Sequence, residues 1–220
     1  MFGRIAQRYD LMNTLMTLGR DRVWRRWTVA AAGAGPGKRA LDVATGTGEL
    51  ALGLARAGCW TVGLDYVEEM LAGAVPKGES LPAGRRPRYL AGDALALPFP
   101  DGTFDCLTTG FALRNVVSVP AALAEMARVL RPGGKLACLE LTPPRGRFFP
   151  RFFSLYFGRL VPLLGGLVAG DRAAYAYLPA SLVGFPTAEA LAELLRQAGF
   201  ARVSHRRLMF GTVALHVAEK

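Results

Sequence analysis

The chain has 220 residues, of which 51% are hydrophobic and 20% are charged, and its formal net charge is +10. A chain of this length is expected to form one domain around one core, and its composition excludes wholesale disorder. The excess of arginine suits nucleic acid, an anionic membrane face or an acidic ligand, although a soluble protein from an arginine-rich proteome has the same composition.

The sequence divides into four segments of a single domain, 1–220. Its first residues, MFGRIAQRYD, lack the apolar stretch of a signal peptide, so we expect a cytoplasmic protein. Residues 1–37 are expected to form a helical cap that ends in the Gly- and Pro-rich linker AGAGPGK. Residues 38–142 are expected to form the cofactor-binding core, 143–186 a helical lid or insertion, and 187–220 a C-terminal helix and hairpin.

Short apolar runs alternate with helix-like patterns along the core segment. The runs typical of buried strands are RALDVAT, WTVGLDY, RPRYLAGD, FDCLTTGF and KLACLEL. The patterns typical of helices are ELALGLARAG, EEMLAGAV and PAALAEMARVL, and the last of these stops at RPGG. This alternation predicts an α/β fold, a doubly wound layer of mostly parallel strands with right-handed crossovers.

The C-terminal part begins with an aromatic and apolar run, Phe148–Gly170, whose arginines and prolines argue against a membrane-spanning helix. An interfacial helix or lid is expected instead, against the membrane or the substrate tail, or else a helix packed on the core or on a second subunit. TAEALAELLRQAGF then predicts an amphipathic helix. Two strands around Gly211 predict an antiparallel hairpin that completes a seven-stranded sheet.

The cysteines Cys59, Cys106 and Cys138 are odd in number, far apart and set in apolar runs, with no CxxC spacing. Buried reduced thiols are therefore expected rather than a disulfide, a zinc site or a nucleophile. The compartment is then reducing, and no metal site is predicted.

A glycine-rich turn, within LDVATGTGEL, joins the first strand to the first helix of the core. Gly46, Gly48 and Ala51 fit the pattern G-x-G-x-x-G/A, in which missing side chains let backbone N–H groups approach a nucleotide. Taken alone, the pattern is not specific. Asp65 ends the second strand, where it can accept hydrogen bonds from ribose hydroxyls, and Asp93 ends the third, where an adenine edge could lie.

The charge beside this turn bears on the choice of nucleotide. Pyrophosphate needs bare N–H groups at a helix N-terminus and no nearby anion, whereas Asp42 precedes the turn and Glu49 follows Gly48 directly. These acids disfavour a dinucleotide and favour S-adenosylmethionine, whose sulfonium and ammonium groups are cationic. Alternatively, Glu49 is a first-turn residue that complements the helix dipole.

Four segments resemble the ubiquinone/menaquinone biosynthesis C-methyltransferases, a class I family that uses S-adenosylmethionine. They are YDLMNTLMTLGRDRVW (9–24), FALRN (111–115), RVLRPGGKLACLELT (128–142) and AYAYLPASLVGFP (174–186), and the resemblance spans residues 2–220. Its departures from the family are mild, with Thr17, Asp21, Arg131 and Thr142 in place of the usual Ser, His, Lys and Ser. Gly110 stands where some members have a cofactor-contacting Ser, so that contact is not carried over.

The resemblance implies that S-adenosylmethionine, without a metal, donates a methyl group to a ring carbon of a prenylated quinol. The loop, the strand ends and the resemblance together assign the cofactor to Asp42, Gly46, Thr47, Gly48, Asp65, Tyr66, Asp93 and Ala94.

The resemblance also implies the catalytic residues. Carbon is a poor nucleophile unless an adjacent hydroxyl loses its proton, so the enzyme is expected to bind the quinol and favour its aryl-oxide. Arg114 is the candidate to stabilise that anion, and Asn115 could orient a hydroxyl or a water that carries the proton away. Tyr9 and Tyr177 could hydrogen-bond the second ring oxygen. The alternatives are a surface ion pair for Arg114 and half-buried packing for the two tyrosines.

Demethylmenaquinol is the expected substrate for a chain that looks bacterial, and the benzoquinol of ubiquinone biosynthesis is the alternative. An RNA methyltransferase would suit the charge, but the sequence has no N-P-P-Y stretch after the fourth strand and no Pro-Cys nucleophile. A nucleotide-binding module without catalysis is a third interpretation. The expected partners are the prenylated quinol, the inner membrane face through a peripheral contact, and a second copy in a homodimer, with no specific nucleic acid.

Overall fold

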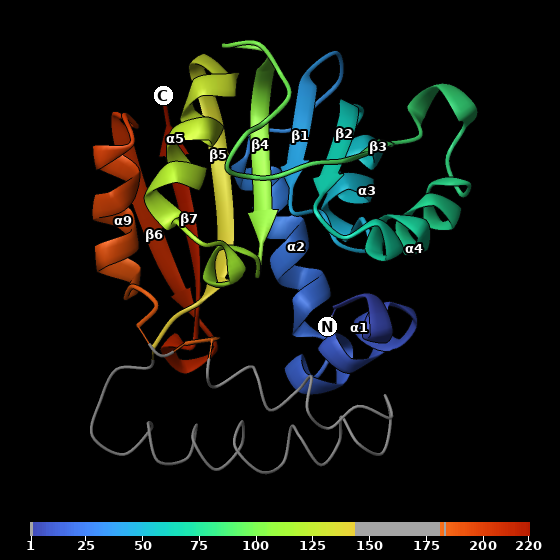
Figure 1. Ribbon diagram of the computed structural model, residues 1–220, viewed down its shortest axis with the longest axis horizontal. Coiled ribbons are helices and arrows are strands. Elements are labelled where there is room, and N and C mark those ends of the chain that lie inside the picture. Colours follow the sequence, from blue (N-terminus) through green and yellow to red (C-terminus); the bar gives the residue numbers. More distant parts are fainter. Residues whose placement is uncertain (1, 144–180, 183) are drawn as a thin grey trace.

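A seven-stranded sheet runs through the centre of the molecule (Figure 1). The structure is a computed structural model that describes residues 2–143, 181–182 and 184–220, without the side chains of residues 2–9. The strands are β1 (Arg39–Val43), β2 (Trp60–Asp65), β3 (Arg88–Ala91), β4 (Phe104–Gly110), β5 (Leu130–Leu141), β6 (Arg202–Leu208) and β7 (Val213–Glu219).

The order of the strands in the sheet is β3-β2-β1-β4-β5-β7-β6. All pairs among β1 to β5 are parallel, whereas β7 is antiparallel to both β5 and β6. The predicted fold, a mostly parallel seven-stranded sheet with an antiparallel C-terminal hairpin, is confirmed.

Helices cover both faces of the sheet and give the molecule three layers (Figure 1). The described helices are α1 (Phe2–Thr17), α2 (Arg20–Ala31), α3 (Glu49–Arg56), α4 (Glu68–Gly78), α5 (Val119–Val129) and α9 (Ala188–Gln197), with short 3-10 turns η1 (Ala83–Arg85), η2 (Leu113–Asn115) and η5 (Met209–Gly211). The helices α2 and α3 pack on one face, and α5 and α9 pack on the other. The helix α1 contacts α2 and α4.

The residues of β5 alternate between two hydrophobic clusters, one on each face of the sheet. Leu136 and Cys138 pack with residues of α5 and α9, whereas Ala137 and Leu139 pack with residues of α2 and α3. A strand that is buried on both faces needs apolar residues at every position, and this is why its sequence reads as a continuous apolar run. All three cysteines are free and buried, as predicted.

The helix α4 extends one turn beyond its predicted end, through Pro76 to Gly78. Proline lacks an N–H, so Pro76 removes one backbone hydrogen bond from the helix. Backbone bonds from Glu79 to the Pro76 carbonyl and from Ser80 to the Lys77 carbonyl close the last turn. The added turn carries Lys77 toward the glycine loop.

The strand β5 begins earlier than its apolar run, at Leu130 rather than at Lys135. Leu130 pairs with Phe104 of β4, and the next paired residue of β5 is Lys135, opposite Cys106. Residues 131–134 therefore bulge out of the ladder. Gly133, with φ of +75°, supplies the left-handed conformation that this bulge uses.

Candidate active site

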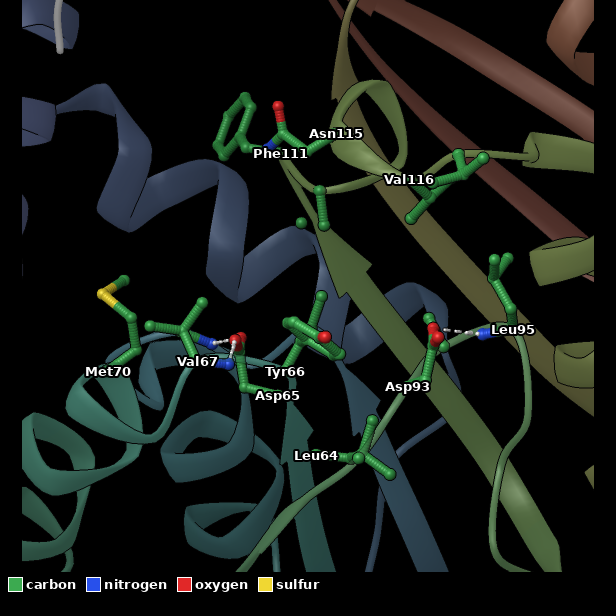
Figure 2. A pocket seen from close by; sticks show the side chains of 17 residues that line it. Leu64, Asp65, Tyr66, Val67, Met70, Asp93, Leu95, Phe111, Asn115 and Val116 are labelled. Carbon is green, nitrogen blue, oxygen red and sulfur yellow. Dashed lines mark hydrogen bonds between the residues drawn. The ribbon is translucent and has the colours of Figure 1, made fainter. Parts of the chain in front are cut away.

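A pocket of about 450 Å³ lies at the carboxyl edge of the sheet, near the ends of β1, β2 and β4 (Figure 2). The chain reverses its direction of strand addition between β1 and β4, and such a switch point leaves a crevice at the strand ends. The predicted residues that line the pocket are Gly46, Asp65, Tyr66, Asp93, Ala94 and Asn115. Four other predicted residues lie outside its lining, namely Asp42, Thr47, Gly48 and Arg114.

The glycine loop turns sharply because three of its residues adopt left-handed backbone angles. These are Ala44 with φ of 54°, Gly46 with φ of 57° and Gly48 with φ of 80°. At Gly48 a Cβ atom would approach Tyr89 Oη to 2.4 Å and Ala74 Cβ to 2.9 Å, so glycine is required for space as well as for conformation. Ala44 lines the pocket in a conformation that costs a non-glycine residue about 1 kcal/mol.

Asp65 is fixed at the end of β2 by backbone donors on both of its oxygens. Gly46 N–H donates to Oδ2 at 2.7 Å, and Val67 N–H donates to Oδ1 at 2.9 Å (Figure 2). Burial raises the pKa of Asp65, and the N–H bonds from Val67, Gly46 and Tyr66 oppose that rise. Each carboxylate oxygen keeps a lone pair after accepting one bond, so Asp65 can still accept two hydroxyl groups.

Three backbone N–H groups of the glycine loop and the helix after it are bonded within the protein. Besides the Gly46 N–H on Asp65, Gly48 N–H donates to the Thr45 carbonyl at 2.9 Å and Ala51 N–H to Asp42 Oδ2 at 3.1 Å. Dinucleotide-binding loops direct such donors at the pyrophosphate. These three donors are therefore not free to bind a diphosphate.

Asp42 is buried behind the loop rather than in the pocket. Its carboxylate accepts hydrogen bonds from the hydroxyls of Thr45 and Thr108, at 2.6 and 2.7 Å, as well as from Ala51 N–H. Burial raises its pKa from 3.8 to about 6, although these hydrogen bonds lower it. In this setting Asp42 holds the loop in shape, and a direct contact with the cofactor stays a prediction.

Glu49 has a cationic partner in the structure. Lys77 Nζ lies 2.7 Å from Glu49 Oε1 and also contacts Asp10 of α1, whose other oxygen accepts the Thr47 hydroxyl at 2.6 Å. The expectation that two uncompensated acids flank the turn is therefore wrong, because one is paired with lysine and the other is buried. A preference against pyrophosphate then depends on the bonded N–H groups of Gly46, Gly48 and Ala51.

Asp93 and Tyr66 form the side of the pocket nearest β3. Leu95 N–H donates to Asp93 Oδ1 at 2.9 Å, and the other carboxylate oxygen has no partner among the described residues. Tyr66 is 78% exposed and lies between Asp65 and Asp93 (Figure 2). A planar base placed between these two acids would have an apolar surface on one side and hydrogen-bond acceptors at its edges.

Arg114 forms a buried ion pair with Glu140 of β5, at 2.5 Å between Nη1 and Oε1, and the two side chains are only 5% and 1% exposed. Arg114 therefore lies outside the pocket lining, and its ion pair is buried rather than at the surface, while its catalytic role stays a prediction. Among the described residues, Arg114 Nε and Glu140 Oε2 have no hydrogen-bond partner. A buried donor and a buried acceptor are thus left unsatisfied within one pair.

Asn115 and Phe111 lie on the side of the pocket that faces β4. They come from η2 and from the end of β4, opposite Asp65 and Tyr66 (Figure 2). Phe111 has φ of 57°, an unusual angle for an aromatic residue, and its N–H donates to the Leu139 carbonyl at 2.8 Å. The Arg114 guanidinium carbon lies 6.0 Å from the Phe111 ring centre, so the ion pair supports this wall.

The two predicted substrate tyrosines are not placed by the structure. Tyr9 belongs to α1, but its side chain is outside the described part, and Tyr177 is outside the described residues, as is Phe148–Gly170. Among the described residues, no helix is long and apolar enough to cross a bilayer. The described part likewise holds no group of three or more His, Cys, Asp or Glu side chains that could bind a metal ion.

Sequence reasoning missed Glu140, Asp10 and Lys77. Glu140 carries a visible signal, since it is the one acid inside the apolar run KLACLEL. The contacts of Asp10 and Lys77 join segments far apart in the chain, so no local sequence pattern predicts them. The left-handed angles of Ala44 and Phe111 were also not predictable, because neither residue is glycine.

The similarity to known proteins extends over the whole chain. The profile of the ubiE/COQ5 methyltransferase family matches residues 1–220. The chain belongs to this family. A "Demethylmenaquinone methyltransferase" of Thermus thermophilus is 47% identical over 222 residues, covering 100% of each chain. A "Ubiquinone/menaquinone biosynthesis C-methyltransferase UbiE" of Desulfotalea psychrophila is 44% identical over 218 residues, covering 98% of this chain and 87% of the relative.

Solved structures with low sequence identity share the fold of this family member. A SAM dependent methyltransferase of Aquifex aeolicus superposes with a TM-score of 0.64 at 20% identity, and the match covers 96% of each chain. Membership of the ubiE/COQ5 family makes the chain a methyltransferase, and both this activity and the family predicted from the sequence are confirmed.

Proposed function

We propose that this chain transfers the methyl group of S-adenosylmethionine to a ring carbon of demethylmenaquinol, forming menaquinol. The observation that carries the proposal is the geometry of Asp65, whose two oxygens are fixed by backbone N–H groups while facing a nucleoside-sized pocket. The full-length similarity to a protein named demethylmenaquinone methyltransferase supports the substrate.

The residues present fit a nucleoside that carries no phosphate. Asp65 would accept the two ribose hydroxyls, and Asp93 would accept from the adenine edge, with Tyr66 and Ala94 beside the base. A pocket of about 450 Å³ is within the usual size of small-molecule sites. When bound, the donor supplies an electrophilic methyl group on a sulfonium.

The protein's own part in the chemistry is to hold the quinol and stabilise its aryl-oxide. Asn115 lines the pocket opposite Asp65 and can donate its amide N–H to a ring oxygen. Arg114 keeps an unsatisfied Nε–H beside this wall, which an aryl-oxide would satisfy. Glu140 is a positioning residue here, because its bond to Nη1 fixes the plane of the guanidinium. A water held by Asn115 would accept the proton.

The remaining proposals concern the prenyl tail and the partners. Tyr9 and Tyr177 stay proposed contacts of the second ring oxygen, and Phe148–Gly170 stays the proposed cover for the tail and the membrane contact. A homodimer and a cytoplasmic location also stay proposals. The reaction needs no metal in this scheme, because positioning and the aryl-oxide supply the rate.

A transfer assay with purified protein tests the proposal. Labelled S-adenosylmethionine is mixed with a demethylated prenyl-naphthoquinol that is kept reduced, and the product is identified by mass. We expect a methylated naphthoquinol. Absence of transfer to this substrate, with transfer to a prenyl-benzoquinol instead, would favour the second candidate, benzoquinol methylation, which the name of the Desulfotalea psychrophila relative also covers.

A further inference from the structure

Two aromatic side chains line the pocket from opposite sides. Tyr66 follows β2 and lies between Asp65 and Asp93, the two acids proposed to hold the nucleoside. Phe111 follows β4 and lies on the other side of the pocket, as does Asn115 (Figure 2). An adenine base beside the two acids accounts for Tyr66, but it leaves the ring of Phe111 unused.

The backbone at Phe111 adopts an angle that favours glycine. Its φ is 57°, in the left-handed region, where a Cβ atom is crowded against the backbone. This turn sends the chain from β4 directly into η2, which the Asn115 N–H closes on the Ala112 carbonyl at 2.9 Å. A glycine would make the same turn without strain. Strained residues of this kind gather at ligand sites, so we expect the ring of Phe111 to have a use that outweighs the strain.

The position of the Phe111 ring is fixed by contacts of both its backbone and its side chain. The Phe111 N–H donates to the Leu139 carbonyl at 2.8 Å, directly after the last pair of the β4–β5 ladder. The side chain is half-buried and packs against the hydrophobic cluster between the sheet and the helices α2 and α3, while it also lines the pocket. A ring held in this way presents a surface that needs no reordering when a ligand binds.

Arg114 lies beside this ring. Its guanidinium carbon is 6.0 Å from the ring centre of Phe111, within reach of a cation–π contact. The cation draws π-electron density toward itself, and a ring depleted in this way stacks better on an electron-rich ring. An aryl-oxide is such a ring. Neighbouring residues would then recognise its two parts, with the unsatisfied Nε–H of Arg114 on the oxygen and Phe111 on the ring.

We infer that Phe111 binds the aromatic ring of the quinol by stacking and holds it beside Arg114 and Asn115. The inference rests on the proposed function, because the ring belongs to the methyl acceptor of that reaction. A stacked contact grows with the area over which two rings overlap. Phe111 therefore favours the fused two-ring naphthoquinol over the single ring of a benzoquinol.

Steady-state kinetics with two quinols test the inference. Phe111→Leu removes the aromatic ring but keeps an apolar side chain, so the wall is still packed. We expect the KM for a prenyl-naphthoquinol to rise about tenfold and that for a prenyl-benzoquinol about threefold, with kcat and the KM for S-adenosylmethionine almost unchanged. Phe111→Tyr keeps the ring and should resemble wild type. If the leucine variant does not fold, Phe111→Gly suits the left-handed angle and should show the same difference between the quinols.

Phe99→Leu is the matched control. Phe99 is also half-buried, packs edge-on against Phe104 with 4.9 Å between the ring centres, and lies outside the pocket lining. Denaturant unfolding should show similar losses of stability in both leucine variants, whereas the KM for the quinols should rise in Phe111→Leu alone. The same rise in KM in both variants, or none in Phe111→Leu, would overturn the inference. So would equal losses with the two quinols, which a merely structural role of the ring predicts.

A binding measurement keeps this inference separate from the proposed function. Protein saturated with S-adenosylhomocysteine is titrated with naphthoquinol or benzoquinol that lacks a prenyl tail, both kept reduced. Phe111→Leu should bind the two-ring quinol about tenfold more weakly than wild type and the single ring about threefold more weakly. If wild type methylates neither prenyl-quinol, the proposed function fails, while these dissociation constants still decide whether Phe111 binds the ring. No binding by wild type, or equal binding by the variant, would overturn the inference.

Discussion

The two walls of the pocket differ in how completely their polar groups are satisfied. On the β2 side, both oxygens of Asp65 are held by backbone N–H groups. On the β4 side, the buried pair of Arg114 and Glu140 leaves one donor and one acceptor without partners among the described residues. On the β2 side, the carboxylate has its hydrogen bonds before any ligand binds. On the β4 side, the unpaired donor and acceptor need a further polar group to satisfy them.

This difference matches the proposed ligands. A cofactor of constant shape is best served by a rigid, pre-arranged acceptor, since no reorganisation is needed on binding. A group whose charge develops during the reaction is best served by a donor that is dry and unsatisfied beforehand. Substitutions on either side of the pocket test this difference.

The largest effect is expected from Glu140→Gln, which breaks the β4 wall. Removing one partner of a buried ion pair leaves an uncompensated charge and costs about 3–5 kcal/mol, so the free energy of unfolding should fall by that amount. Affinity for S-adenosylmethionine, measured by calorimetry on the folded variant, should change less than threefold. Glu193→Gln, in an exposed pair with Arg196, should cost under about 0.5 kcal/mol.

A double variant separates stability from chemistry on this wall. Arg114→Met/Glu140→Leu replaces the pair with apolar groups, and such replacements are often neutral or stabilising. It should recover most of the lost unfolding free energy and still transfer no methyl group above background. A double variant that turns over like wild type would remove Arg114 from the mechanism.

The next effect is expected from Asp65→Asn, which breaks the β2 wall. Hydrogen bonds to a charged acceptor contribute about 1.5–3 kcal/mol each, so losing the charge should weaken S-adenosylmethionine binding about 100-fold. Calorimetric titration measures the change, with Asp101→Asn as the control because Asp101 pairs with Arg128 away from the pocket. Equal affinity of Asp65→Asn and wild type would show that the donor binds elsewhere.

A pH-dependent effect of comparable size is expected from Asp42→Asn, behind the same wall. The pKa of Asp42 is raised from 3.8 to about 6 by burial, so the folded protein holds this proton more tightly than the unfolded chain does. The stability from that proton is fully present below about pH 3.8 and is lost as pH rises through about 6. The loss amounts to about 3 kcal/mol at most.

Denaturant unfolding at several pH values measures this effect. Wild type should lose stability relative to Asp42→Asn between about pH 4 and pH 7, and the variant should lack that part of the slope. The difference between the two proteins is the quantity to follow, because other groups titrate equally in both. A difference that stays constant across this range would contradict the assignment of the raised pKa to Asp42.

The fold was largely predictable because local patterns of apolar residues indicate its strands and helices. Continuous apolar runs such as KLACLEL indicate strands buried on both faces, and their alternation with helical patterns leads to a doubly wound sheet. The ends of elements were less predictable. Pro76 suggests the end of a helix, yet α4 continues through it. The RPGG stretch suggests a loop before β5, yet it forms a bulge within that strand.

The site was predictable only where a strand end determines it. Asp65 and Asp93 reach the pocket because the carboxyl ends of parallel strands meet at one edge. The settings of Asp42, Glu49 and Arg114 depend on partners from elsewhere in the chain, Thr108, Lys77 and Glu140. Sequence spacing does not reveal such tertiary pairs. From the sequence, Glu49 therefore counts as a negative charge beside the turn, without its partner Lys77.

The smallest effect is expected from Lys77→Met, which tests whether the ion pairs beside the glycine loop contribute to the β2 side of the pocket. Lys77 is the cation between Asp10 of α1 and Glu49 of α3, and its side chain is 27% exposed, so solvent screening limits the loss to about 1 kcal/mol. Without it the two carboxylates repel, and α1 should open more often from the glycine loop. Hydrogen exchange of α1 amides should become about fivefold faster, while Lys135→Met, in a looser pair with Glu219, should leave it unchanged. Asp65 makes no contact with Lys77, so the affinity for S-adenosylmethionine should stay within threefold of wild type. A larger drop in affinity would mean that the packing of α1 over the glycine loop, rather than Asp65, holds the cofactor.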